Sequence, residues 1–348
     1  MNGRGLFIIF ALLMEKKNEI VMSGIRPTGF LHLGNYFGAL RNYVRMQEEY
    51  TCYFMVADLH ALTTLKDTKE LKEHVRRVLS ENIACGLDPD KVALYCQSHV
   101  PETTELYLYL NMLAYVGELE KTPTFKDKVR LQPDNVNAGL LTYPVLQAAD
   151  ILLHRATLVP VGKDQEQHLE MARNYVNRFH HRYGEEIFPE PYAFNFGEEL
   201  AKVPSLDGLG KMSKSENQMA TLYLADADDV ILNKIKKAKT DSGATEPGSP
   251  MPDTIANLFQ LMKLVSPEEK LKQFQSDYQA GTIRYGDLKK ELGADMVKFI
   301  SPIREKAEAI RNDEPYLKRV MEQCAAKARH SAQITLQLVK QAMGLRYF

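Results

Sequence analysis

Short apolar runs alternate with amphipathic segments over about the first 160 residues, and this order restricts the fold more than any other feature. The apolar runs read as buried strands at residues 20–24, 53–58, 92–96 and 158–161. Helical patterns fill the intervals at residues 35–49, 69–85, 103–120 and 142–153. Strands that alternate with helices predict a parallel sheet with right-handed crossovers, so we expect an α/β domain.

The chain changes character after residue 222. Residues 226–239 read as a helix that is acidic in its first turn and basic in its last, as the helix dipole favours. From residue 255 onward only helical patterns occur. Because 348 residues are too many for one compact core, we predict an α/β domain at residues 22–222 and an all-helical region at residues 223–348.

Residues 1–21 form an N-terminal extension that begins with a short apolar run at residues 6–14. This run is well below the ~20 residues that a membrane span needs, so we predict no membrane segment. A signal peptide is one interpretation, but no small-residue cleavage site follows. We favour the other, in which Met14 is the true start.

The composition excludes few functions. The net charge of −1 gives no global basic field for nucleic acid, although a local basic face remains possible. The four cysteines have neither CxxC spacing nor a histidine at a zinc-ligand offset. We interpret them as reduced thiols and expect a reducing compartment, the cytoplasm.

A first glycine-rich segment, residues 24–36, follows the first strand and opens a helix. Its glycines permit tight turns and let a ligand approach the backbone, and a helix N-terminus suits phosphate. His32 is placed to donate to a phosphate oxygen. The segment is neither GxGxxG nor a Walker motif, and a structural histidine beside a glycine is the alternative.

A second segment, residues 208–215, contains two lysines three positions apart and two hydroxyls after a pair of glycines. We call it the lysine loop. Such a loop can supply positive charge to a polyphosphate leaving group as its bond breaks. The alternative is a solvated surface loop.

Together the two segments are far more specific than either alone. Residues 32–35 (HLGN) resemble the HIGH signature of class I aminoacyl-tRNA synthetases, and residues 211–215 (KMSKS) match the second signature of that family in full. The resemblance implies a Rossmann-like nucleotide-binding domain, ATP as a substrate, and Mg²⁺ to help close the loop over pyrophosphate.

Further segments resemble the tryptophan-specific branch of this family. These are residues 142–153, 159–168 and 58–61, and the resemblance covers about residues 22–345. Asp150 stands in an otherwise apolar helix, where an unpaired carboxylate is costly. It is suited to accept a hydrogen bond from an indole N–H; the alternative is a protein donor, such as a backbone N–H or Arg155.

The resemblance also assigns roles to individual residues, with no resident metal site. The catalytic residues would be His32, Asn35, Lys211 and Lys214. The ATP site would comprise Arg26, Pro27, Thr28, Gly34, Asn35, Gly162, Lys163, Asp164, Val203, Lys211, Met212, Ser213, Lys214 and Ser215. The tryptophan site would comprise Met22, Gly24, His60, Tyr143, Gln147, Asp150, Val161 and Gln165.

The chain departs from the branch at four of these positions. His32 stands where many relatives have Thr, Asn35 replaces the second histidine of the signature, Arg26 replaces a common Gln, and Lys163 replaces a common acidic residue. Arg26 either contacts ATP phosphate or braces its loop.

The implied reaction is the activation of L-tryptophan by ATP and its transfer to tRNA(Trp). The family implies a homodimer with residues 106–125 and neighbouring helices at the contact; the alternative for this segment is an ordinary core helix. The family also implies a helical region that binds the anticodon, with the last helix packed back on the α/β domain. Lys234, Lys236, Lys237 and Lys239 form a basic cluster suited to phosphate, or a solvated helix face. Three rivals remain: a tyrosyl synthetase, a small-molecule adenylyltransferase and a non-catalytic tryptophan sensor.

Overall fold

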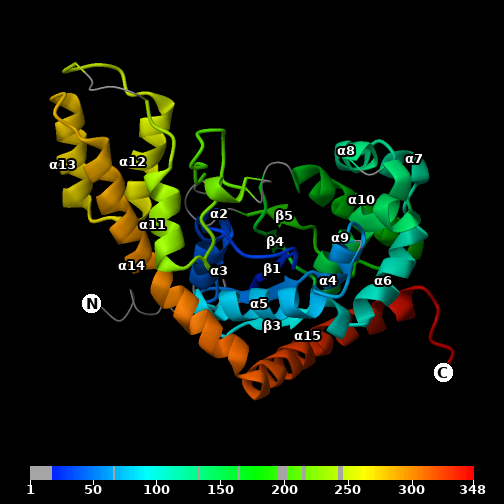
Figure 1. The fold of residues 1–348 in the computed structure, drawn as a ribbon. Coiled ribbons are helices and arrows are strands. Elements are labelled where there is room, and N and C mark those ends of the chain that lie inside the picture. Colours follow the sequence, from blue (N-terminus) through cyan, green and yellow to red (C-terminus); the bar gives the residue numbers. More distant parts are fainter. Residues whose placement is uncertain are drawn as a thin grey trace, which may run out of the picture.

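A five-stranded, fully parallel sheet forms the centre of the computed structural model (Figure 1), which describes residues 18–65, 67–131, 133–162, 165–194, 202–213, 217–241 and 246–348. The strands are β1 (Ile20–Ile25), β2 (Thr51–Val56), β3 (Ala93–Cys96), β4 (Leu158–Val159) and β5 (Tyr192–Ala193). Their order is β3-β2-β1-β4-β5. This confirms the predicted Rossmann-like parallel sheet.

The strand order determines where a ligand fits. β1 pairs with β2 from Ile20↔Thr51 to Ile25↔Val56, and with β4 at Val21↔Leu158. The chain therefore adds β2 and β3 on one side of β1, and then adds β4 and β5 on its other side. In such sheets the crevice beyond the carboxyl ends of the strands, at this change of direction, is the usual ligand site.

Helices cover both faces of the sheet and join the strands. They are α2 (Leu33–Asn35), the π-helical turn η1 (Tyr36–Leu40), α3 (Arg41–Met46), α4 (Asp58–Leu62), α5 (Leu71–Ala84), α6 (Glu102–Asn111), α7 (Val116–Leu119), α8 (Pro123–Leu131), α9 (Ala138–Leu153) and α10 (Glu166–Tyr183). Short 3₁₀ turns lie at η2 (Gln97–His99), η3 (Pro133–Asn135) and η5 (Gln218–Ala220). Asn137 starts α9 by accepting the Leu140 N–H at 2.9 Å.

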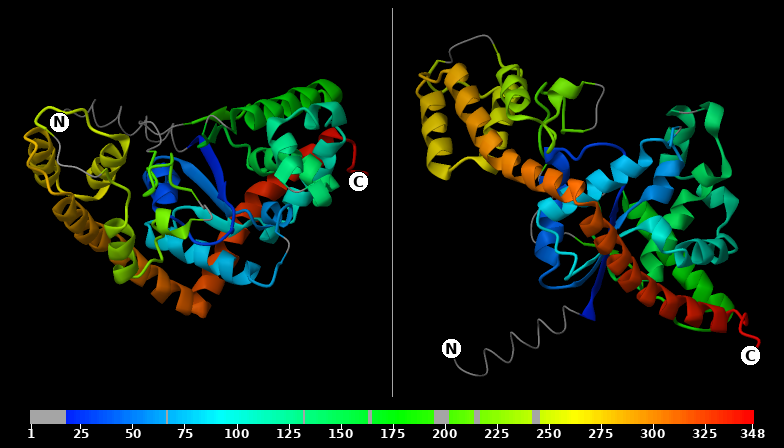
Figure 2. Two further views of the ribbon diagram at one scale, coloured as in Figure 1. Left: turned by 45° about the horizontal axis from the view of Figure 1, so that its top comes forward. Right: turned by 60° about the horizontal axis from the view of Figure 1, so that its bottom comes forward.

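The described residues after Leu224 contain helices and no strand, as predicted: α11 (Asp228–Lys236), α12 (Asp253–Val265), α13 (Glu268–Gln279), α14 (Tyr285–Asn312) and α15 (Glu314–Ala342). The first four form a group beside the sheet. α15 then turns back under the sheet and packs against β3 and α6 (Figures 1 and 2). Its apolar side, from Leu317 to Val339, belongs to the core around the sheet.

A second core is formed by the helical group together with residues from both nucleotide segments. Leu33 and Phe37 of the first segment and Met212 of the lysine loop are buried in it. They pack with residues of α11, α12 and α14, such as Ile231, Leu258 and Met296. The two segments predicted to bind ATP are therefore attached to the helical group through shared apolar packing.

Some predicted elements differ from the structure. The prediction of one continuous helix over residues 103–120 is wrong: α6 ends at Asn111 and α7 begins at Val116, which is 58% exposed. The fourth strand ends at Val159, because Pro160 has no N–H to extend the ladder. The helix over residues 35–49 contains the π-helical turn at Tyr36. Among the described helices, none has the length and apolar content to cross a membrane.

Candidate active site

A cavity of ≈ 980 Å³ opens at the carboxyl ends of β1, β2 and β4, where the strand order predicts a ligand site. We call it the main cavity. It gathers residues from the first segment, α9, the turn after β4 and the lysine loop. The predicted residues that line it are Met22, Gly24, Arg26, Gly34, Asn35, His60, Tyr143, Gln147, Asp150, Val161, Gly162, Gln165 and Lys211.

Asp150 lies on α9 with only 1% of its surface exposed, and it is held by two side chains. His60 Nε2 donates to Asp150 Oδ2 at 2.8 Å, and Gln97 Nε2 donates to Oδ1 at 2.8 Å. Burial raises the pKa of the Asp150 carboxyl, while the hydrogen bonds from His60 and Gln97 act to lower it. The protein donors are thus His60 and Gln97 rather than Arg155, and a carboxylate with four lone-pair positions retains capacity for a ligand donor.

Tyr143 and Gln165 are joined by a residue that the sequence did not single out as a site residue, His168. The Tyr143 hydroxyl lies 3.0 Å from His168 Nε2, and His168 Nδ1 lies 2.9 Å from Gln165 Oε1. Because the amide oxygen of Gln165 only accepts, His168 Nδ1 is the donor and its Nε2 is an acceptor. The Tyr143 hydroxyl donates its proton to Thr124 Oγ1 at 2.5 Å, and the Thr124 hydroxyl donates to His168 Nε2 at 3.1 Å. This network fixes one wall of the main cavity.

The first segment brings His32 and Asn35 together at the start of α2. His32 Nδ1 accepts the Asn35 N–H at 3.3 Å, and Asn35 Oδ1 accepts the His32 N–H at 3.0 Å. This reciprocal cap fixes both side chains. A Cβ added at Gly34 would lie 2.9 Å from the His32 ring and 3.2 Å from the Met212 carbonyl oxygen. Glycine is therefore required where the lysine loop approaches the first segment.

Six other predicted residues that the structure describes lie outside the lining of the main cavity. His32, Pro27, Val203 and Met212 are buried, and Thr28 and Ser213 are exposed. Met212 N–H donates to the Val203 carbonyl at 2.7 Å, so these two residues form the base of the lysine loop. Lys163, Asp164, Lys214 and Ser215 fall outside the described residues, and their roles stay predictions.

The sequence interpretation missed several cavity residues, of which Lys128 on α8 has the greatest consequence. Its Nζ lies 3.4 Å from the centroid of the Tyr143 ring. Burial, with a smaller contribution from the Arg26 charge, lowers the pKa of Lys128 to about 8. Arg26 donates from Nη2 to Thr64 Oγ1 at 2.5 Å. No spacing signal distinguished Lys128 from its neighbours, because only the fold brings α8 over the cavity.

The lowered pKa of Lys128 predicts a pH-dependent affinity for ATP. Below about pH 8 the ammonium group is charged and attracts phosphate; above it the free protein loses that charge. If bound phosphate restores an ordinary lysine pKa, the affinity for a non-hydrolysable ATP analogue falls about tenfold between pH 7 and 9. Calorimetric titration across this range measures the fall. Lys128→Arg should remove it while binding stays tight, and an equal fall in Lys128→Met would refute the assignment.

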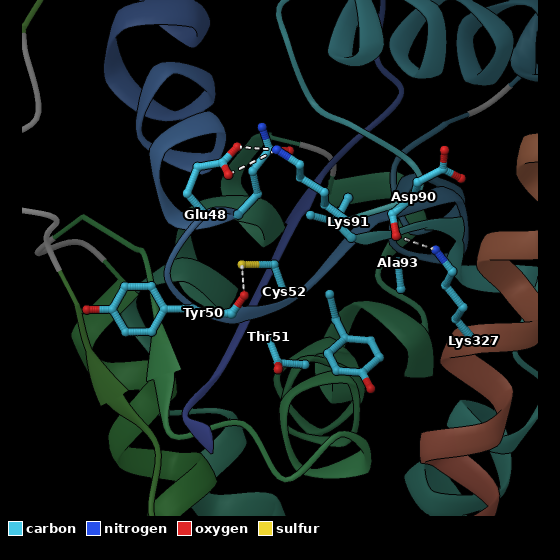
Figure 3. A pocket seen from close by; sticks show the side chains of 11 residues that line it. Glu48, Tyr50, Thr51, Cys52, Asp90, Lys91, Ala93 and Lys327 are labelled. Atoms are coloured by element: carbon cyan, nitrogen blue, oxygen red, sulfur yellow. Dashed lines mark hydrogen bonds and ion pairs between the residues drawn. The ribbon is translucent and has the colours of Figure 1, made fainter. Parts of the chain in front are cut away.

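A second cavity of ≈ 430 Å³ lies at the opposite, amino-terminal edge of the sheet (Figure 3). Its two lysines already have partners: Lys91 Nζ lies 2.7 Å from Glu48 Oε1, and Lys327 Nζ donates to the Pro89 and Asp90 carbonyls at 2.7 and 3.0 Å. These cations are neutralised or hydrogen-bonded within the protein. The main cavity is therefore the candidate active site.

The family model for class I tRNA synthetases (W and Y) matches residues 14–301. It covers most of the chain, including the main cavity and both nucleotide segments. The chain therefore belongs to the class I tRNA synthetases, the class that the parallel sheet and the two segments define.

Individual relatives lie in the tryptophan branch of this family. The chain is 53% identical to the tryptophan–tRNA ligase of Porphyromonas gingivalis over 94% of its own length and 100% of that protein. It is 39% identical to the tryptophan–tRNA ligase of Clostridium tetani, over 95% and 97% of the two chains. A solved tryptophanyl-tRNA synthetase from Campylobacter jejuni, complexed with ADP and tryptophan, is 35% identical, with a TM-score of 0.84 over 93% of this chain and 99% of that one.

Proposed function

We propose that this chain activates L-tryptophan with ATP and transfers it to tRNA(Trp) for protein synthesis. The main observation behind this function is that the lining of one cavity combines the carboxylate of Asp150 with apolar side chains and three cations, Arg26, Lys128 and Lys211. An aromatic amino acid with an N–H donor suits the carboxylate among apolar side chains, and a polyphosphate suits the cations. The family and its tryptophan-branch relatives point the same way.

The proposed chemistry needs no side-chain nucleophile. A carboxylate oxygen of tryptophan attacks the α-phosphorus of ATP, the bond to the β-phosphate breaks, and pyrophosphate leaves with the bonding electrons. A ribose hydroxyl of the terminal adenosine of tRNA then attacks the carbonyl carbon, and AMP leaves. Positioning and electrostatic stabilisation supply the rate.

We assign the binding of tryptophan to Asp150 and the residues around it. We propose that Asp150 accepts the indole N–H, with His60 holding the carboxylate in place. Met22 and Gly24 form the floor. Tyr143, Gln147, Val161 and Gln165 form the walls and hold the ammonium group; Tyr143 and Gln165 are fixed by the His168 network.

For ATP we propose that Asn35 and His32 hold phosphate oxygens through the capped start of α2. Lys211, Ser213, Lys214 and Ser215 act on the pyrophosphate, and the turn at Gly162, Lys163 and Asp164 supports the ribose. Mg²⁺ enters with ATP as part of the substrate. Among the described side chains, no group of three or more His, Cys, Asp or Glu is placed to hold a metal ion.

We propose that the helical region contacts tRNA. The boundary between the catalytic part and the tRNA-binding part would then lie at about residue 222. Lys236, Lys237 and Lys239 are exposed and available to phosphate. Lys234 was wrongly included in this basic cluster: it is 4% exposed, and its Nζ lies 2.7 Å from Asp226 Oδ2. Because the proposed substrate is tRNA used in protein synthesis, we also propose that the protein acts in the cytoplasm.

We further propose a homodimer through α6, α7 and α8. These helices expose a set of large apolar side chains: Leu108, Met112, Tyr115, Val116 and Leu131. Exposed apolar side chains on consecutive helices are typical of a protein–protein contact.

Met112→Glu is expected to convert the dimer to monomer at micromolar concentration, because two copies of a charge would be buried near the contact. Sedimentation equilibrium measures the mass. Val230→Glu on α11 is the control, since it adds the same charge elsewhere on the surface. A monomeric wild-type protein, or a Met112→Glu protein that remains dimeric, would exclude this contact.

Charging of tRNA tests the proposed function against its rivals. We expect purified protein to esterify tRNA(Trp) with tryptophan and ATP. A tyrosyl synthetase would charge tRNA(Tyr), whereas an adenylyltransferase of small molecules or a tryptophan sensor would charge neither.

A further inference from the structure

The two nucleotide segments are joined by residues 221–226, which follow the lysine loop. Leu33 N–H donates to the Leu222 carbonyl at 2.9 Å, and Leu224 N–H donates to the Leu31 carbonyl at 2.9 Å, so this stretch lies antiparallel to the first segment around His32. We call residues 221–226 the clamp segment. Its position determines how the chain that leaves the lysine loop lies against His32.

Thr221 connects the clamp segment to the lysine loop itself. The residue is fully buried, and its Oγ1 donates to the carbonyl oxygen of Ser213 at 2.8 Å. This hydrogen bond reaches across eight residues and closes the loop at its base. The other side of the same loop is tied by the Met212 N–H to the Val203 carbonyl.

Lys234 on α11 binds both ends of the clamp segment. Its buried Nζ donates to the Thr221 carbonyl at 2.9 Å and to Asp226 Oδ2 at 2.7 Å. The same Asp226 oxygen accepts the Tyr223 N–H at 2.9 Å. A buried ammonium that satisfies a backbone carbonyl and a carboxylate at once fixes both ends of the clamp segment.

The clamp segment is also attached to the long helix of the helical group. Arg304 on α14 donates to the Asp226 carbonyl at 2.7 Å and to Asp228 Oδ1 at 2.8 Å. Hydrogen bonds therefore run from α14 through Asp226, Lys234 and Thr221 to the backbone of the lysine loop.

We infer that Thr221 and Lys234 are positioning residues for adenylate formation, which hold residues 211–213 against the His32 segment. This inference rests on the proposed function. Neither side chain lines the main cavity, so both act through the backbone that carries Lys211. Since misplacement of a charged group by a fraction of an ångström weakens its effect on a transition state, loss of either contact should lower the rate of the step and spare tryptophan binding.

Thr221→Val is the sharpest test, because it keeps the shape of the side chain and removes one hydroxyl. We expect the kcat of tryptophan-dependent pyrophosphate exchange to fall about tenfold, while the Kd for tryptophan stays within about twofold. Thr221→Ser restores the hydroxyl and should recover the rate. The matched control is Thr335→Val, which alters an equally buried threonine that donates to the Ser331 carbonyl in α15.

Lys234→Met gives a second variant, with Lys270→Met as the control for loss of an ion pair elsewhere in the helical group. We expect the first to lower kcat and the second to leave it unchanged. A kcat for Thr221→Val equal to that of Thr335→Val would overturn the inference. The inference would also be overturned if Thr221→Val lowered both the affinity for tryptophan and the melting temperature. Losses of both together indicate general destabilisation of the protein.

Amide hydrogen exchange gives a readout that does not depend on activity. Residues 211–213 should exchange faster in Thr221→Val than in Thr335→Val, and equal exchange would overturn the positioning role. If the wild-type protein shows no tryptophan-dependent pyrophosphate exchange, the proposed function fails, and amide exchange still decides whether Thr221 holds the loop.

Discussion

Lys211→Ala is expected to lower the rate of tryptophan-dependent pyrophosphate exchange by about a hundredfold or more, with the Kd for tryptophan almost unchanged. Lys211 lines the main cavity, and the Met212 carbonyl beside it lies against Gly34 at the start of α2. A cation at that place meets the negative charge that develops as pyrophosphate leaves. Loss of one such preorganised group typically costs ~10²–10³ in rate.

The control for Lys211→Ala is Lys237→Ala, which removes an exposed lysine from the end of α11 and leaves the net charge of the protein the same as in the test variant. We expect that control to retain the wild-type rate of exchange. Equal rates for wild-type protein and Lys211→Ala would remove Lys211 from the mechanism. A large loss of tryptophan affinity would instead indicate damage to the cavity as a whole.

Asp150→Asn is expected to weaken tryptophan binding by about a hundredfold. The carboxylate accepts from both His60 and Gln97, and an amide offers one acceptor oxygen and places an NH₂ donor where an acceptor is needed. Each buried donor left without a partner costs ~1–3 kcal/mol, and the indole N–H competes for the oxygen that remains. The chain contains no tryptophan, so the fluorescence of the ligand reports binding without background.

Glu102→Gln is a suitable control for Asp150→Asn, because it neutralises another buried carboxylate, which pairs with Arg329 far from the main cavity. It should leave tryptophan affinity unchanged. If Asp150→Asn binds tryptophan as tightly as the wild type, Asp150 serves only to hold His60 and Gln97, and the indole is recognised elsewhere.

The sequence predicted the parallel sheet, and it singled out residues that prove to line the main cavity, because both depend on local features. A buried strand such as β2, with Asp58 and His60 just beyond its end, is visible in the order of residues along the chain. Asp150 was conspicuous because it interrupts an apolar helix. The residues of the first segment, such as His32 and Asn35, were likewise recognised from a short run of neighbours in sequence.

Other parts of the site depend on contacts across the fold, and no local pattern carries them. Lys128 reaches the main cavity only because α8 packs over Tyr143. His168 reads as an ordinary helical residue until its hydrogen bonds to Tyr143 and Gln165 are seen. Lys234 looks like one lysine of a basic helix, yet Asp226 and the Thr221 carbonyl hold it inside. The break between α6 and α7 escaped prediction because apolar residues continue through it.

Pyrophosphate exchange with tryptophan and with tyrosine tests the central claim most directly. The claim is that one cavity holds an indole at Asp150 and the phosphates of ATP at Lys211. The account predicts that tryptophan supports exchange of labelled pyrophosphate into ATP and that tyrosine at equal concentration does not. Exchange driven by tyrosine, or no exchange with either amino acid, would contradict it.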